Sequence, residues 1–281
     1  MSPSLRLSLS TWPQALQWPA WLLLAGISGQ LLKYLEIPAG QFLGPMLTAI
    51  LFGVCGASIR VPRLAFRLGQ GSVGMLAAHS MTLAVLTAML QSWHVMLVAT
   101  LLTVSLSALV GLVLVRFGGI AASTAAWGTA PGAASAMVSM ADEFGADSRV
   151  VATMQYVRVV CVVMVGALVS HWIGAPASGS EAHASQMALH GMSLPNVGLS
   201  IVAIVCGVLL GSRVPAGALL VPLLLGGALQ VSELLQISLP SWLLACAYGA
   251  IGGYIGLRFD RPTLSYVFGH LPAMIGGALL L

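Results

Sequence analysis

The sequence predicts an all-α membrane protein, a polytopic helical bundle built from two homologous repeats. Of its 281 residues, 58% are hydrophobic and only 6% are charged, whereas soluble domains carry about 25% charged residues. Apolar runs close to the ~20 residues that cross a bilayer as a helix recur along the chain. An ordered series of Pro and Gly motifs also returns at a nearly constant offset. This composition excludes a soluble enzyme and a nucleic-acid-binding domain.

The expected organisation follows these apolar runs. Residues 1–17 form an N-terminal cytoplasmic segment, 18–173 the first membrane repeat, 174–196 a polar connecting loop and 197–281 the second repeat. The N-terminal segment has one arginine and lacks the compact apolar core of a signal peptide. The expected membrane spans are 18–35, 40–56, 65–88, 94–116, 149–173, 197–212, 217–232 and 242–258.

The repeat is carried by matching elements in the two halves. Ile37-Pro38-Ala39-Gly40 with Leu43 and Pro45 matches Val214-Pro215-Ala216-Gly217 with Leu220 and Pro222, and Pro62, Gly71 and Gly74 match Pro240, Gly249 and Gly252. At this offset Leu281 corresponds to a position inside the helix 94–116. We therefore expect the second repeat to be incomplete, with the chain stopping within a helix.

Residues 117–148 interrupt the apolar pattern, because they are small and polar around a central Pro131-Gly132 that breaks a helix. A re-entrant hairpin here would place nine Lys and Arg residues on the side of the N-terminus and one on the other, whereas a full crossing would give five on each side. The positive-inside rule favours the hairpin, an N-terminus in the cytoplasm and inverted repeats in the inner membrane. Inverted repeats with a broken element are the architecture of many secondary transporters.

Arg158 is the residue most indicative of function. It lies nine residues after Arg149 in an apolar run, which places it roughly 14 Å along a helix and close to the bilayer midplane. A charge at that depth requires a partner or a cavity. One interpretation is an anion-binding site in which Arg158 acts with Gln155 and the Pro131-Gly132 backbone; the alternative is a structural ion pair. The predicted substrate-binding residues are Pro131, Gly132, Ser135, Gln155 and Arg158.

Three carboxylates, Asp142, Glu143 and Asp147, are candidates for ion coupling. Asp147 also directly precedes the helix 149–173, where an N-cap residue is expected, and this capping role is the favoured interpretation for it. The six histidines show no metal-ligand spacing, and the chain contains neither a Walker loop nor a nucleophile elbow. We therefore expect no metal, no cofactor and no enzymatic activity.

The stretch from Pro131-Gly132 through Ala141-Asp142-Glu143 and Arg149-Val150-Val151 to Arg158 resembles the signature of the AbrB-duplication membrane family. The elements at 38–45 and 215–222 look like that family's duplicated unit. Two departures are Pro131-Gly132-Ala133 where the family has Pro-Gly-Gly, and Val221 where the first repeat has Gly44. The resemblance implies two inherited labels, ammonia monooxygenase and regulator of gene expression. The first is unsupported, since no metal-ligand cluster is found in the sequence.

The expected function is secondary transport of a small, anionic solute across the inner membrane. The alternative is a membrane regulator or sensor that acts indirectly on gene expression. The expected partners are the solute and the lipid bilayer, and no nucleic acid, because the cations are scattered singly along the chain. The sequence leaves open whether the protein is a homo-oligomer.

Overall fold

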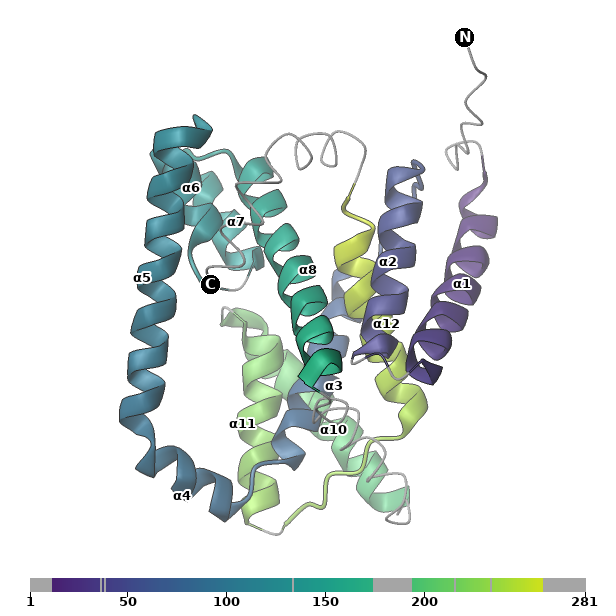
Figure 1. Ribbon diagram of the computed structural model, residues 1–281. Coiled ribbons are helices and arrows are strands. Elements are labelled where there is room, and N and C mark those ends of the chain that lie inside the picture. Colours follow the sequence, from purple (N-terminus) through teal and green to yellow (C-terminus); the bar gives the residue numbers. More distant parts are fainter. Residues whose placement is uncertain are drawn as a thin grey trace. The chain divides into compact units, whose positions relative to one another are not determined.

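The computed structural model describes residues 12–35, 37, 39–132, 134–173, 194–214, 216–232 and 234–259, and all regular structure in these ranges is helical (Figure 1). The helices are α1 (Gln14–Tyr34), α2 (Gly40–Val54), α3 (Arg63–His79), α4 (Leu83–Gln91), α5 (Trp93–Gly118), α6 (Ala122–Thr129), α7 (Ala134–Glu143), α8 (Ser148–Ile173), α10 (Leu194–Leu210), η2 (Gly211–Arg213), α11 (Gly217–Val231) and α12 (Ser241–Gly256). Three parts of the predicted organisation lie outside the described residues: positions 1–11, the loop 174–193 and the end of the second repeat, 260–281.

The chain divides into two compact units. The first contains α1, α2, α3, α10, η2, α11 and α12. The second contains α4 to α7 and α8 as far as Gly166.

The segment predicted as one span, 65–88, is instead two helices. α3 ends at His79, α4 begins at Leu83, and the two are bent by 87°. The hydroxyl of Thr82 accepts a hydrogen bond from the backbone N–H of Val85 at 3.3 Å, which makes Thr82 the N-cap of a new helix. The apolar composition of the segment is continuous, so hydropathy alone did not reveal this local cap.

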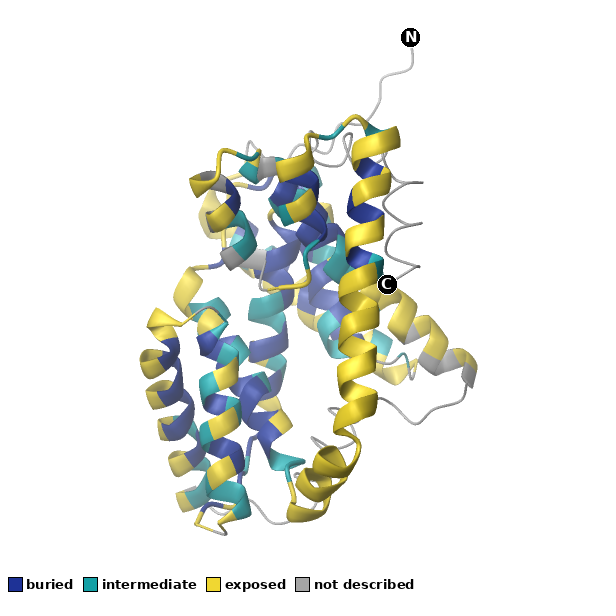
Figure 2. Cartoon of the chain, turned by 90° about the vertical axis from the view of Figure 1, so that its left-hand side faces the viewer, coloured by how far each residue is buried: buried dark blue, intermediate teal, exposed yellow. Residues whose placement is uncertain are grey.

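Two helical stretches, Trp93–Gly118 and Pro195–Arg213, are long and apolar enough to cross a bilayer, and α3 with α4 gives a third if the bent pair is one span. α5 buries only Ser107, Val110, Gly111 and Leu114, all in its C-terminal half. Apart from Leu106 and Gly118, which are half-buried, the rest of this apolar helix is exposed, as Figure 2 shows. α2 and α11 have 15 residues each, about 22 Å, and are therefore shorter than the hydrocarbon core of a bilayer.

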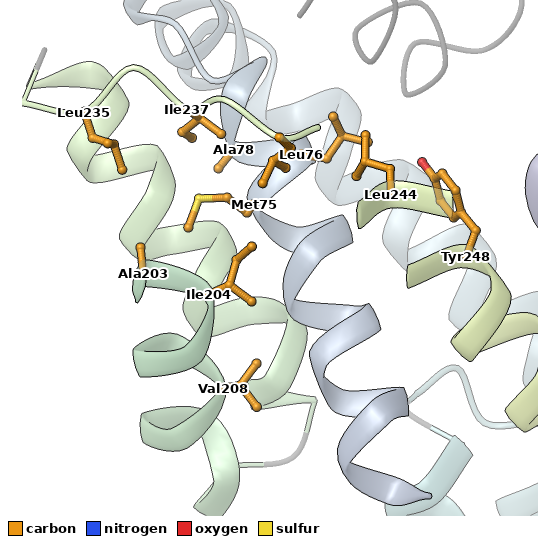
Figure 3. Packing of buried hydrophobic residues seen from close by; sticks show 11 residues of the cluster. Met75, Leu76, Ala78, Ala203, Ile204, Val208, Leu235, Ile237, Leu244 and Tyr248 are labelled. Atoms are coloured by element: carbon orange, nitrogen blue, oxygen red, sulfur yellow. The ribbon is translucent and has the colours of Figure 1, made fainter. Parts of the chain in front are cut away.

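The first unit contains two hydrophobic clusters of similar construction. In one, Met75 and Leu76 of α3 pack with Ala203, Ile204 and Val208 of α10 and with residues of the 235–239 segment and α12 (Figure 3). In the other, Tyr254 and Leu257 at the end of α12 pack with residues of α1, α2 and the 57–61 segment. Each cluster therefore combines helices and an extended segment from different halves of the sequence.

The two extended segments have the same burial pattern. Alternate residues are buried in each: Ala57, Ile59 and Val61 in one, and Leu235, Ile237 and Leu239 in the other. Buried polar side chains bind their backbone N–H groups, since Gln17 Oε1 accepts from Ser58 N at 2.9 Å and Ser200 Oγ accepts from Ser238 N at 3.2 Å. Buried non-helical backbone is stable only with such partners.

Glycine contacts between the helices also occur in matched pairs. A Cβ on Gly74 of α3 would collide with the Leu219 carbonyl of α11, and a Cβ on Gly252 of α12 would lie 3.1 Å from the Phe42 carbonyl of α2. Ala39 and Ala216, which precede α2 and α11, both have positive φ values, 57° and 56°. Pro62 and Pro240 precede α3 and α12 with nearly identical backbone angles. The local geometry of α2 and α3 is thus repeated in α11 and α12.

Candidate functional site

The candidate site is built around a break between two short helices of the second unit. α6 ends at Thr129 and α7 begins at Ala134. Pro131 has no backbone N–H, so it cannot continue the hydrogen-bond ladder of α6. The last carbonyl groups of α6 must therefore find donors outside their own helix.

α8 supplies these donors through two side chains one turn apart. Gln155 is fully buried, and its Nε2 donates to the carbonyls of Trp127 at 2.9 Å and Ala130 at 3.1 Å. Arg158 Nη1 donates to the Ala130 carbonyl at 3.1 Å, and Arg158 Nη2 donates to Gln155 Oε1 at 2.8 Å. We call Gln155 and Arg158 together the carbonyl clasp.

Two further contacts of Arg158 are longer. Nη1 lies 3.5 Å from the Thr129 carbonyl and Nη2 lies 3.4 Å from the Gly132 carbonyl. Hydrogen bonds of this type are usually 2.7–3.2 Å, so these two are weak. The guanidinium is thus fixed by two good hydrogen bonds and retains two weak ones that another acceptor could replace.

α5 binds the same helix end from another direction. The Ser107 hydroxyl donates to the Thr129 carbonyl, while the Thr129 hydroxyl donates back to the Ala125 carbonyl at 2.9 Å. Gly111 permits the approach, since a Cβ there would lie 2.9 Å from Thr129 Oγ1. Val110, Leu114, Ala125 and Met154 form the apolar cluster beside these contacts.

The electrostatics of the clasp involve one formal charge. The C-terminal end of a helix carries partial negative charge, and the Arg158 guanidinium is placed against the C-terminal end of α6. Among the residues that the structure describes, every hydrogen-bond partner of Arg158 is uncharged: three backbone carbonyls and the Gln155 amide. The half-buried guanidinium is therefore a positive charge to which no carboxylate among the described residues is hydrogen-bonded.

The structure brings together four of the five predicted substrate-binding residues. Gln155 and Arg158 contact each other, Gly132 joins them through its carbonyl oxygen, and Pro131 lies in the break itself. Pro131 and Gly132 are both exposed. The side chain of the fifth residue, Ser135, lies outside the described residues.

The three candidate coupling carboxylates have different positions. Asp147 Oδ1 accepts from the backbone N–H of Val150 at 3.2 Å, and the Asp147 carbonyl accepts from Val151 N at 3.0 Å. Asp147 therefore caps α8, as predicted. Glu143 is exposed at the end of α7, and the Asp142 side chain lies outside the described residues. A role in ion coupling stays a prediction for all three.

Several residues of the site were not predicted from the sequence. Ser107 is a single hydroxyl in an apolar run, and its contact with Thr129 depends on how α5 and α6 pack. Trp127 contributes only its carbonyl to the clasp, while its ring stacks on Phe144 with centroids 5.6 Å apart. Within the described ranges, no group of three or more His, Cys, Asp or Glu residues is arranged to hold a metal ion.

Comparisons with known proteins agree with the signature around the break. The family model described as "Transition state regulatory protein AbrB" matches residues 42–281. An Escherichia coli (strain K12) protein named "Putative regulator AbrB" is 40% identical over 242 residues, which cover 85% of this chain and 69% of the relative. The "Uncharacterized protein YhjN" of Bacillus subtilis (strain 168) is 33% identical over 137 residues, 44% of this chain and 36% of that protein.

No solved structure matches the chain significantly. The family match over most of the chain and the 40% identity to the E. coli protein carry the assignment. The protein belongs to the AbrB family.

Proposed function

We propose that this chain is a multi-pass protein of the inner membrane with its N-terminus in the cytoplasm. Support comes from α5, whose N-terminal half exposes Val95, Leu97, Val98, Leu101 and Leu102. A soluble monomer rarely exposes so large a contiguous apolar surface, whereas lipid covers it without cost. The positions of the cations support the orientation through the positive-inside rule.

We further propose that the two halves are inverted repeats. In the first unit α3 packs on α11 with Gly74 near Leu219 and Ala78 near Gly226, so the two helices run in the same direction. The corresponding pair, α2 and α12, is also parallel, with Gly252 near Phe42 and Gly256 near Ala49. A two-fold axis that exchanges the halves accounts for both pairings. Inversion follows if α2 and α3 are antiparallel, as Figure 1 draws them.

Cysteine accessibility tests this arrangement in intact cells. In a variant without the four native cysteines, single cysteines replace Glu36, Arg60, Glu181 and Arg213 and are treated with a membrane-impermeant maleimide. Inverted repeats with a cytoplasmic N-terminus predict labelling at 36 and 181 and protection at 60 and 213. Labelling at 36 and 213 with protection at 60 and 181 would mean that 117–148 crosses the membrane and would contradict the inversion.

The function that the site supports best is secondary transport of a small anionic solute. The observation that carries this proposal is the half-buried Arg158 at a helix break, whose hydrogen-bond partners among the described residues are all uncharged. A positive charge within a membrane is costly without a counter-ion or a watery cavity, and an anionic solute would supply the counter-ion. Broken helices near the bilayer midplane are the usual substrate sites of such transporters.

The clasp provides a means of binding and release. An anion approaching the exposed Pro131 and Gly132 would displace the two weak contacts of Arg158, those with Thr129 and Gly132, while the bonds with Ala130 and Gln155 remain. Gln155 would keep the guanidinium oriented during this exchange, because its amide bonds both Arg158 and the end of α6. Bidentate contact with a carboxylate, phosphate or sulfate suits the planar guanidinium.

Transport is tested in proteoliposomes by solid-supported-membrane electrophysiology. Inorganic phosphate, sulfate, acetate and succinate are supplied in turn, and we expect a saturable current with one of these anions. Arg158→Ala should abolish the current while the protein remains folded, and Arg158→Lys should retain part of it, because lysine keeps the charge but loses the fork geometry. Arg116→Gln, outside the clasp, is the control. A current unchanged in Arg158→Ala would refute the assigned role.

The second candidate function is a membrane regulator or sensor without flux, which the name of the E. coli relative favours. The same anions would then bind without producing a current. Binding measured by thermal shift of the purified protein, with no counterflow in proteoliposomes, would favour this function. Neither function requires a catalytic step, and we propose that the chain is not an enzyme.

A further inference from the structure

One end of the first unit carries exposed arginines: Arg258 Cζ lies 4.3 Å from the centroid of the Tyr254 ring, and three more arginines lie between residues 60 and 67. Arg60 lies in the extended segment 57–61, and Arg63 and Arg67 lie one turn apart at the start of α3. Arg60 Nη1 donates to the carbonyls of Ala57 at 3.1 Å and Ile59 at 2.9 Å, which fixes its position. Within the described ranges, no hydrogen bond or ion pair involves the side chains of Arg63 and Arg67. We call these three residues the arginine cluster.

Aromatic side chains lie at the same end of the unit as the arginine cluster. Phe66, between Arg63 and Arg67, stacks on Tyr254 with ring centroids 4.0 Å apart. Gln17 bonds the Trp12 carbonyl at 2.8 Å and the Ser58 N–H at 2.9 Å, so Trp12 lies at the same end as Arg60. The Trp12 side chain is 48% exposed. Exposed Trp beside cationic side chains is typical of the headgroup level of a bilayer.

The opposite end of the unit has the corresponding extended segment and helix start, but it lacks the three arginines. At the repeat offset, Ser238, Ser241 and Ala245 occupy the positions of Arg60, Arg63 and Arg67. Leu244 and Leu76 take the places of Phe66 and Tyr254, and they pack together in the cluster of Figure 3. Because this end has the same framework without arginines, the arginines are not needed for packing.

We propose that the arginine cluster binds the phosphate groups of anionic phospholipids at the cytoplasmic surface. Guanidinium groups form paired, charge-assisted hydrogen bonds with phosphate oxygens. The flanking Trp12 favours a lipid over a dissolved anion, since an exposed indole is stable where headgroups meet hydrocarbon. The proposal rests on the membrane location proposed above and is independent of transport.

Spin-labelled lipids test the proposal on the purified full chain in phosphatidylcholine vesicles. Electron paramagnetic resonance measures the fraction of label immobilised by the protein, for spin-labelled phosphatidylglycerol and for spin-labelled phosphatidylcholine. The wild type should select phosphatidylglycerol. Each arginine near an anionic surface contributes about fivefold in affinity, so Arg60→Gln/Arg63→Gln/Arg67→Gln should lower the association constant about a hundredfold.

A second variant separates binding from folding. Arg63→Gln/Arg67→Gln keeps the Arg60 hydrogen bonds and should still reduce the association constant about twentyfold. Lys33→Gln removes an exposed cation that lies outside the cluster, at the opposite surface in the proposed topology, and should leave the selectivity for phosphatidylglycerol within about twofold of wild type.

Three outcomes would overturn the proposal: no preference for phosphatidylglycerol in the wild type, an equal preference in the double variant, or an equal loss in Lys33→Gln. Displacement of the lipid by millimolar inorganic phosphate would identify a site for free phosphate instead. Arg158→Ala is measured in parallel and should bind phosphatidylglycerol as the wild type does. The absence of an anion current in proteoliposomes would not change the expected selectivity for phosphatidylglycerol. The transport proposal and the lipid-binding proposal can therefore be refuted separately.

Discussion

The two units of the chain are held together by different interactions. In the first unit, helices approach at glycines until backbone meets backbone, as where Gly74 packs on the Leu219 carbonyl. In the second unit, a broken helix is held by polar side chains, chiefly Gln155 and Arg158. Close backbone packing permits little movement. Hydrogen bonds of unequal length at a helix break can be exchanged with a ligand, which agrees with the site proposed in the second unit.

Removal of the clasp should have the largest effect on stability. Gln155→Leu keeps a similar volume but removes the donor to the Trp127 carbonyl and the acceptor of Arg158 Nη2, at a cost of about 1–3 kcal/mol for each group left without its partner. The Ala130 carbonyl keeps its hydrogen bond from Arg158 Nη1. Hydrogen–deuterium exchange followed by mass spectrometry should show faster exchange in α6 and α7 and unchanged exchange in α3 and α11. Equal acceleration in both units would contradict the separation between them.

Local features of the site were predictable from the sequence, whereas its long-range contacts were not. Pro131-Gly132 predicted the break because proline lacks a donor, and the position of Asp147 before an apolar run predicted a cap. Gln155 and Arg158 are one helical turn apart, which predicted that they share a face. Their carbonyl partners lie 25 to 29 residues away, and sequence spacing carries no information about such contacts. The alternative considered from the sequence, an ion pair of Arg158 with a carboxylate, is not seen among the described residues.

The positions of the helices were also predictable only in part. Apart from α3, whose predicted span ended at residue 88 and not at His79, the apolar runs located the helices of the first unit to within a few residues, and the repeat motifs fell where α2 and α11 begin. The break between α3 and α4 was missed, because Thr82 acts through one hydrogen bond that leaves hydropathy unchanged. Hydropathy records the solvent preference of a segment, while helix ends depend on single polar groups.

Glycine substitutions in the first unit should have the next largest effect. Gly74→Ala and Gly252→Ala each place a methyl group against backbone of a neighbouring helix, and overpacking of this kind costs about 1–3 kcal/mol. The midpoint temperature of thermal unfolding of the detergent-solubilised protein measures the loss of stability in each variant. Gly74→Ala should lower the stability more than Gly252→Ala, because its Cβ would collide with the Leu219 carbonyl oxygen, whereas a Cβ on Gly252 would lie 3.0 Å from Met46 N.

Gly249→Ala is the matched control for these substitutions, since a Cβ at Gly249 would meet nothing within 4 Å. Replacing an unhindered helical glycine by alanine stabilises a helix by up to about 1 kcal/mol. Gly249→Ala should therefore raise the midpoint temperature of unfolding, whereas Gly74→Ala and Gly252→Ala should lower it. A lower midpoint temperature in Gly249→Ala would show that close packing does not explain the losses expected at Gly74 and Gly252.

The smallest effect concerns the cap of α8. Asp147→Ala removes the hydrogen bond that the backbone N–H of Val150 donates to the Asp147 carboxylate, and should destabilise the start of α8 by about 1 kcal/mol. Asp147→Asn retains a capping oxygen without the charge and should restore most of this stability. If ion coupling also required the carboxylate, Asp147→Asn would lose the anion current in proteoliposomes while keeping the stability of wild type. If Asp147→Ala lowers both the anion current and the stability, and Asp147→Asn restores both, helix capping accounts for the role of Asp147. The search for a coupling group would then turn to Asp142 and Glu143.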